Sequence, residues 1–255
     1  MDISLLAALL SGALVALLLT LFGGGGSVLA TPLLLYVVGV RDPHVAIGTS
    51  AAAVAVNAAA GLAAQARAGR VKWPCALTFG APGLVGSLVG AHLAKAVAGQ
   101  HLLLGFAAAM AAVGLSMFRA PGSPGDPDVR IDPAKAVRLV PIGAATGLAA
   151  GFFGIGGGFL IAPGLMAATG MTLANAAASS LVSVTLFGAA TSVSYAASGL
   201  VDGRLFLALV VGGAFGVVAG ARLAPRLAAR AGLARRLFAA MIVATAAYVA
   251  WRALS

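Results

Sequence analysis

The sequence predicts an all-α polytopic membrane protein, with about ten transmembrane segments arranged as two inverted five-segment repeats with glycine-broken helices. Three observations predict this class. Of the 255 residues, 61% are hydrophobic and only 9% are charged, whereas a soluble domain carries roughly 25% charged residues. The apolar stretches are roughly 13–24 residues long, which suits helices and not outer-membrane strands. Similar glycine-rich motifs also occur in both halves of the chain.

Each half contains five apolar segments. They cover approximately 3–22, 27–39, 44–66, 74–97 and 101–118 in the first half, and 136–153, 158–170, 173–198, 204–227 and 233–253 in the second. We expect the first segment to be a retained helix, because it lacks the basic start and cleavage site of a signal peptide. The second segment of each half spans only roughly 20 Å. It either crosses a thinned bilayer steeply or forms a half-helix buried among its neighbours.

A polar segment divides the chain. The stretch "RAPGSPGDPDVRIDP" at 119–133 contains four prolines and three of the six acidic residues, which is typical of a linker. The predicted organisation is therefore an N-terminal repeat at 1–118, a linker at 119–135 and a C-terminal repeat at 136–255.

The two halves resemble each other at a nearly constant spacing. Pro163 corresponds to Pro32, and the preceding glycines match at the same spacing. The spacing then shortens by one position, as from Ser50 to Ser180, and several glycines keep it, among them Gly83, Gly86 and Gly90 with Gly213, Gly216 and Gly220. Since each repeat has an odd number of segments, the second is predicted to be inverted relative to the first.

The basic residues predict the orientation. They gather at 67–72, 119–138 and 226–236, and these clusters fall on one side only if all ten segments cross. The positive-inside rule then favours a multi-pass protein with both termini outside and the linker inside. The net charge of +10 does not predict nucleic-acid binding, because the basic residues lie in loops between apolar spans.

Two consecutive glycine runs predict a substrate site. They occur in "GGGGSVLATP" at 23–32 and "GFFGIGGGFLIAP" at 151–163. In inverted repeats such breaks meet near the bilayer midplane, and the free N–H groups of the short helices starting at Ser27 and Gly158 suit an anion. The alternative is helix packing, which we favour for spaced glycines such as Gly86 and Gly90. The candidate residues of the two runs are Gly23, Gly24, Gly25, Gly26, Ser27, Gly154, Gly156, Gly157 and Gly158.

Polar residues follow each run in the next long segment. Their hydroxyl and amide groups are candidates to donate hydrogen bonds to a bound oxyanion. The alternative is that they bond to their own helix or to neighbouring helices. These candidates are Thr49, Ser50 and Asn57 in the first half, and Ser179, Ser180 and Ser183 in the second.

The missing residue types limit the chemistry. The chain contains no Glu, and its six Asp residues lie in loops or at the N-terminus. No paired carboxylate, nucleophile–base pair or metal-ligand spacing occurs, and Cys75 is the single cysteine. We therefore expect no catalytic residue, metal or cofactor, and no enzyme activity. Since a negative cytoplasm expels a monovalent anion with about 2.3 kcal/mol per 100 mV, uncoupled export is the favoured direction.

The paired glycine-rich segments ending in proline, and the segments "AIGTSAAAVAVNAAAG" and "AAASSLVSVTLFGAATS" that follow them, resemble the TauE/SafE sulfite exporter family. The resemblance covers nearly the whole chain and implies transport of sulfur-containing anions such as sulfite, sulfoacetate or related organosulfonates. It also implies location in the cytoplasmic (inner) membrane. Ser27 departs from the symmetry, since the second half has Gly158 there. The expected partners are a small anion and the lipid bilayer; the sequence gives no oligomeric state. Alternatives are a pathway for another small organic or inorganic anion, a channel-like or sensory protein, a membrane-embedded enzyme and a cation pathway.

Overall fold

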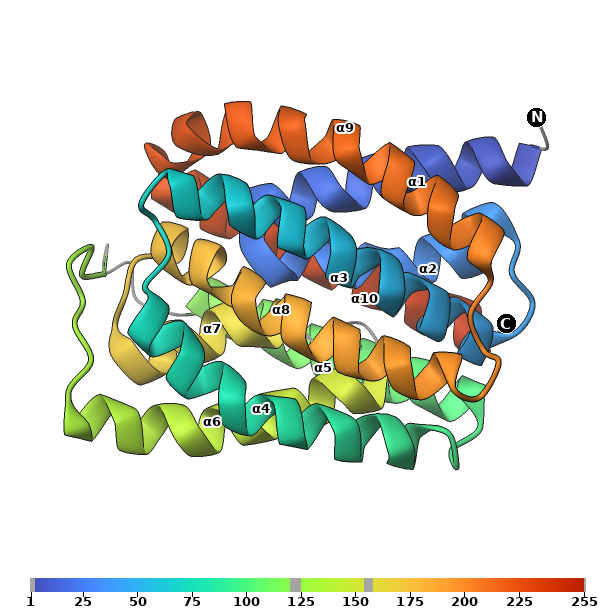
Figure 1. Cartoon of the computed structure of the whole chain (residues 1–255), viewed down its shortest axis with the longest axis horizontal. Helices are drawn as coiled ribbons and strands as arrows, with labels where there is room; N and C mark the ends of the chain where they lie inside the picture. The colour runs from blue at the N-terminus through green and yellow to red at the C-terminus, as the bar shows by residue number, and fades with distance from the viewer. Residues whose placement is uncertain (1–2, 120–124, 154–157, 255) are drawn as a thin grey trace.

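The computed structural model describes residues 3–119, 125–153 and 158–254. Within these ranges the regular structure is helical, apart from one isolated bridge between Asp126 and Met171. The helices lie side by side in one bundle (Figure 1). Eight helical stretches of the described chain are long and apolar enough to cross a membrane. The prediction of an all-helical, multi-pass membrane protein is therefore confirmed.

The helices follow the predicted segments closely. In the first half they are α1 (Ile3–Phe22), the 3₁₀ helix η1 (Gly23–Leu29), α2 (Ala30–Leu33), the π-helix η2 (Leu34–Val38), α3 (Pro43–Arg67), α4 (Trp73–Ala94) and α5 (Gly99–Arg119). In the second half they are α6 (Pro133–Phe153), α7 (Gly158–Thr169), α8 (Leu173–Ala196), α9 (Gly203–Ala228) and α10 (Ala231–Leu254). Length and hydropathy alone therefore locate the segments, because a membrane imposes both.

The first glycine run makes the chain turn back on itself. The helical stretch Ile3–Val38 is 36 residues long, but η1, α2 and η2 all pack against α1. Gly23 has a left-handed φ of +64°, which glycine adopts without steric cost. A side chain on Gly26 would overlap the backbone of Leu18 and Leu19. The prediction that the short helix begins at Ser27 is wrong, because the 3₁₀ helix already begins at Gly23. The described part of α7 starts at Gly158, directly after residues 154–157, which lie outside the described ranges.

Several helices begin at side-chain caps. Asp42 accepts a hydrogen bond from the His44 N–H (2.8 Å) at the start of α3. Thr172, which holds the equivalent position in the second half, accepts one from the Asn175 N–H (3.2 Å) at the start of α8. Such caps satisfy donors that a helix start leaves unpaired.

In the linker, Asp132 accepts a hydrogen bond from the Lys135 N–H and forms an ion pair with its ammonium group, both at 2.8 Å. These contacts hold the pKa of Asp132 below its ordinary value of 3.8. The exposed pair therefore stabilises the start of α6 at neutral pH, and its contribution is lost as the pH falls through the lowered pKa.

The long helices pair across the two halves. α1 packs along α9, and α4 packs along α6. Side chains added to Gly216 and Gly86 would overlap the carbonyl oxygens of Ala13 and Ala144, respectively. Small residues let helix backbones approach closely in membranes. The spaced glycines therefore serve helix packing, as expected for Gly86 and Gly90.

The ends of the bundle differ in charge. In Figure 1, α1 begins and α10 ends at the right-hand end, while the α3–α4 and α9–α10 connections and the start of α6 lie at the left-hand end. The basic segments 67–72, 130–138 and 226–236 are therefore at one end. Arg41, Arg204 and Arg252 lie near helix ends at the other, where Arg252 packs over the ring of Tyr36 at 5.2 Å.

Candidate functional site

The two glycine runs meet inside the bundle. The backbones of Gly24 and Gly158 touch: a Cβ on Gly24 would lie 2.8 Å from the Gly158 oxygen, and a Cβ on Gly158 would overlap Gly24. Both residues are buried. Residues from the two halves, far apart in the sequence, thus approach as closely as two backbones can. Gly154, Gly156 and Gly157 lie outside the described residues.

Each glycine of the first run faces a different neighbour. Gly23 lies against Ala177 and Ser180 of α8, and Gly25 lies against the ring of Phe238 in α10. Ser27 is fully buried and donates a hydrogen bond to the Gly24 oxygen at 2.7 Å. The run is therefore closely packed on several sides, and any ligand would have to displace protein atoms.

Ser180 and Ser50 both bond to the short segment of the first half. The Ser180 hydroxyl accepts a hydrogen bond from the Gly24 N–H (2.9 Å) and donates to the Ala177 oxygen (2.8 Å). The Ser50 hydroxyl donates to the Ile47 oxygen (3.0 Å) and lies 2.8 Å from the Thr31 hydroxyl. Sequence reasoning missed Thr31, although a threonine immediately before Pro32, which ends the repeated motif, offered a signal.

Thr49 and Ser179 lie beside these serines but bond elsewhere. Thr49 Oγ1 accepts a hydrogen bond from the Asp202 N–H, and Ser179 Oγ accepts one from the Lys72 N–H, both at 2.9 Å. The two bonds are equivalent, because Thr49 corresponds to Ser179, and Lys72 to Asp202, at the spacing of the repeat. Each hydroxyl anchors the loop that leads into α9 or α4, and neither forms a hydrogen bond with the described glycines of the runs.

Asn57 borders a small space with a mainly apolar lining. Its side-chain amide donates to the Leu209 oxygen at 3.4 Å and occupies the volume that a side chain on Gly213 would need. Next to it, a cavity of about 10 Å³ is enclosed by α1, α2, α3 and α9. It is lined by Gly12, Val15, Ala30, Ser50, Ala53, Val54, Asn57 and Leu209. Such a volume accommodates about one water molecule.

Ser183 is the candidate without a partner. Its hydroxyl is fully buried and makes no hydrogen bond within the described residues. A Cβ on Gly80 of α4 would stand 3.4 Å from this hydroxyl, an ordinary contact. The buried hydroxyls of Thr191 and Tyr195 also lack partners among the described residues. A buried hydroxyl without a hydrogen-bond partner lowers stability by about 1–3 kcal/mol. A polar group that bonded to the Ser183 hydroxyl would remove this cost.

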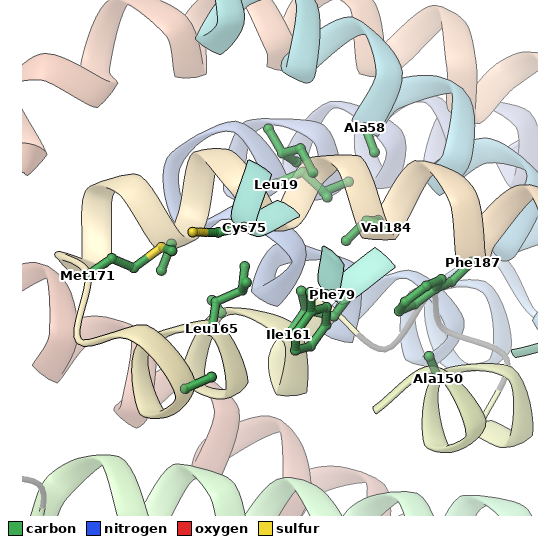
Figure 2. Packing of buried hydrophobic residues seen from close by; sticks show 14 of the residues in the cluster. Leu19, Ala58, Cys75, Phe79, Ala150, Ile161, Leu165, Met171, Val184 and Phe187 are labelled. Carbon is green, nitrogen blue, oxygen red and sulfur yellow. The ribbon is translucent and has the colours of Figure 1, made fainter. Parts of the chain in front are cut away.

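The buried polar groups are neutral. They comprise hydroxyl groups of serine and threonine together with Asn57 and Gln65. The single thiol, Cys75, is buried in the apolar cluster shown in Figure 2. Among the described residues, no group of His, Cys, Asp and Glu side chains is arranged to hold a metal ion. This set of donors can bind an anion but offers no pair for acid–base chemistry.

Comparisons with known proteins agree with this composition. Residues 8–249 match the family described as "Sulfite exporter TauE/SafE". The chain is 46% identical over 250 residues to a probable membrane transporter protein of Xylella fastidiosa, covering 98% of this chain and 96% of that protein. It is 26% identical over 206 residues to the probable membrane transporter protein YdhB of Bacillus subtilis, covering 78% and 81% of the two chains. No solved structure matches.

Proposed function

Because the chain belongs to the sulfite exporter TauE/SafE family, we propose that it is a secondary transporter that exports small sulfur-containing anions across the cytoplasmic membrane. The substrates are sulfite, sulfoacetate or related organosulfonates. The observation that carries the proposal is the buried contact between Gly24 and Gly158. It brings a helix break from each half together at a place where hydroxyl groups gather and no carboxylate is buried among the described residues.

The anion is held by neutral donors. The candidates nearest the contact are the N–H group of Gly24 and the hydroxyls of Ser27 and Ser180, which already bond to one another or to the Gly24 oxygen. An oxyanion between these groups would take over bonds that the protein now makes to itself. Hydrogen bonds to an ionised acceptor are roughly twice as strong as neutral ones, so the exchange favours binding.

Transport requires the helices around the breaks to separate. The cavity beside Ser50 and Asn57 holds about 10 Å³, which suits a water and not a sulfonate. In this proposal, the described arrangement is therefore the closed state of the transporter. Opening toward one end and then the other moves the anion across, as in other transporters with paired broken helices.

The proposed architecture is an inverted repeat with ten crossings. Its domains are 1–118, the cytoplasmic linker 119–135, and 136–255, with both termini outside. Two observations support it. The equivalent bonds from Lys72 to Ser179 and from Asp202 to Thr49 have the same length. The three basic segments also lie at one end of the bundle, as the positive-inside rule requires of cytoplasmic loops.

Flux into proteoliposomes of the purified protein tests the function. The panel is sulfite, sulfoacetate, thiosulfate, sulfate and short carboxylates, each measured with and without an imposed membrane potential. We expect saturable uptake of sulfite or an organosulfonate that accelerates when the potential is positive inside the vesicles and therefore draws anions in. Flux of a different anion alone would change the substrate, and non-saturable flux would favour a channel-like pathway. Uptake that ignores the potential would contradict the uncoupled mechanism.

A further inference from the structure

A cavity with two arginines opens where α9 meets α10. It has a volume of about 510 Å³ and is lined mainly by Leu21, Leu223, Arg226, Leu227, Arg230 and Leu233. We call it the basic vestibule. Cavities that hold small molecules are typically of roughly 300–1,000 Å³, so this one is large enough for an organic anion.

The charge of the basic vestibule is positive and unbalanced. Arg226 and Arg230 are both exposed, and none of the residues that line the cavity is acidic. Asp202 is the last acidic residue in the sequence. Two guanidinium groups on successive turns repel each other, and a bound oxyanion between them would relieve this repulsion while accepting charge-assisted hydrogen bonds.

The inner wall of the basic vestibule leads toward the first glycine run. Leu21 and Leu227 pack against the hydrophobic cluster that contains Phe22 and Phe238. The rings of Phe22 and Phe238 stack, with centroids 5.4 Å apart. On its other side, the Phe238 ring fills the space that a side chain on Gly25 would need. A stacked pair of rings therefore separates the cavity from the run.

The opposite end of the α1–α9 pair has a cavity of different character. It measures about 280 Å³, and its lining includes both Asp202 and Arg204. Asp202 is also engaged as the cap of α9, where it accepts hydrogen bonds from the N–H groups of Arg204 (2.9 Å) and Leu205 (3.1 Å). Charges of both signs line this cavity, whereas the basic vestibule attracts anions only.

We propose that the basic vestibule is the entrance at which the transported oxyanion first binds, between Arg226 and Arg230, before it passes Phe22 and Phe238 to the first glycine run. This inference rests on the proposed function and adds a first binding site to it. Positive charge at the mouth of a cleft raises the local concentration of anions and their association rate. The arginines therefore act on the apparent affinity for the anion and not on the later crossing step.

Uptake of radiolabelled sulfoacetate into inverted membrane vesicles tests the entrance, because these vesicles expose the cytoplasmic face. In the double variant R226Q/R230Q, KM should rise about fivefold or more while Vmax stays within about twofold, and KM should lose much of its dependence on salt. Arg222→Gln is the matched control. Arg222 is exposed on the same helix, one turn before Arg226, and is not among the residues lining the cavity. Its KM should stay within about twofold of the wild-type value.

Three results separate the possibilities. An unchanged KM in the double variant, with normal wild-type uptake, would overturn the entrance alone. A rise in KM that disappears in proteoliposomes of phosphatidylcholine would assign the arginines to the phosphate of an anionic lipid and also overturn it. Absence of saturable uptake of sulfite, sulfoacetate and related organosulfonates by the wild-type protein would overturn the proposed function.

A binding measurement tests whether the basic vestibule binds the anion, independently of transport. Ala229 also lines the cavity, and Ala229→Cys combined with Cys75→Ala provides one exposed thiol. Sulfoacetate should slow the reaction of this thiol with a neutral maleimide by about threefold or more, and R226Q/R230Q should abolish the protection. Equal reaction rates with and without sulfoacetate would contradict binding at this place.

Discussion

The same helix contact is built twice in this protein, once around Asn57 and once around Phe187. Asn57 of α3 fills the space beside Gly213 of α9. Phe187 of α8, at the equivalent position of the second half, fills the space beside Gly83 of α4. The glycines are equivalent, but one accommodates a polar amide and the other an aromatic ring.

The residues around Asn57 and Phe187 also differ in side-chain size. Ala30 and Leu209 line the small cavity next to Asn57. At the corresponding spacing, the second half has the larger side chain of Ile161 in place of Ala30, and Phe79 corresponds to Leu209. Both belong with Phe187 to one hydrophobic cluster (Figure 2). Larger side chains thus fill the second region, whereas smaller ones leave room for about one water in the first.

The two equivalent positions therefore differ in how tightly their surroundings are packed. The Phe187 region is dense and apolar, so it stabilises the bundle through packing. The Asn57 region keeps a small space that Asn57 and Ser50 border together with apolar side chains. Side chains at equivalent positions of the two halves therefore pack differently.

The largest expected effect comes from emptying the apolar region. Phe187→Ala removes a fully buried ring and should lower the free energy of unfolding by about 4 kcal/mol. Unfolding in detergent measures this loss. Phe187→Leu, which keeps most of the volume, should cost much less, and equal losses in both variants would contradict a packing role.

The contact between Gly24 and Gly158, which joins the two halves, should be nearly as sensitive. In Gly24→Ala, the new methyl group meets the Gly158 backbone and the Val184 side chain, which should cost about 3 kcal/mol of stability and abolish transport. Gly203→Ala is the control, since a Cβ there has no atom within 4 Å. Normal flux and stability in Gly24→Ala would show that the two runs do not meet as described.

Ser180→Ala should have an intermediate effect. It leaves the buried Gly24 N–H without the acceptor it now has at 2.9 Å, which should cost about 2 kcal/mol. Ser50→Ala leaves the Thr31 hydroxyl free to turn to another acceptor and should cost less. Thermal unfolding of the two variants checks this order, and the reverse order would contradict the assignment of Gly24 to Ser180.

Asn57→Ala should act on transport more than on stability. Its amide bond to Leu209 is long, at 3.4 Å, so the loss of stability should be small. If the amide also contacts the anion, KM should rise roughly fivefold, which corresponds to about 1 kcal/mol for one hydrogen bond. A kinetic titration of sulfoacetate uptake measures this, and an unchanged KM would remove Asn57 from the site.

The smallest effects should come from the loop anchors. Thr49→Val and Ser179→Ala each remove one bond to a loop N–H, and each should cost about 1 kcal/mol of stability without changing KM. The two losses should be equal within error, because the bonds are equivalent. Unequal losses would argue that the repeat does not extend to these loops.

Much of the fold follows from local patterns. Runs of apolar residues located the segments within a few residues. The prediction for Ser27 failed because glycine propensity suggested an open break, whereas the reversal at Gly23 is compact enough for a 3₁₀ helix. Propensity describes an isolated segment, and here packing against α1 overrides it.

The sequence predicted the candidate site less completely than it predicted the fold. The sequence identified the buried hydroxyls, but it did not separate Ser180, which bonds to Gly24, from Ser179, which bonds to Lys72. Adjacent residues on a helix point about 100° apart, so their partners depend on which helices surround them. The basic vestibule was also not predicted, because its arginines were assigned only to orientation.

By itself, the sequence determined that this is a helical membrane protein of the TauE/SafE family, where its spans lie and where its glycine runs and basic loops fall. These features depend on composition and on the length of apolar runs, which the bilayer imposes on each segment separately. Only the tertiary structure decided that α1 packs along α9 and that Gly24 meets Gly158. It also decided that Phe187 fills the space beside Gly83, whereas Asn57, at the equivalent position, borders a small cavity. Such contacts join residues that are distant in the sequence, and they depend on the shapes of both partners at once.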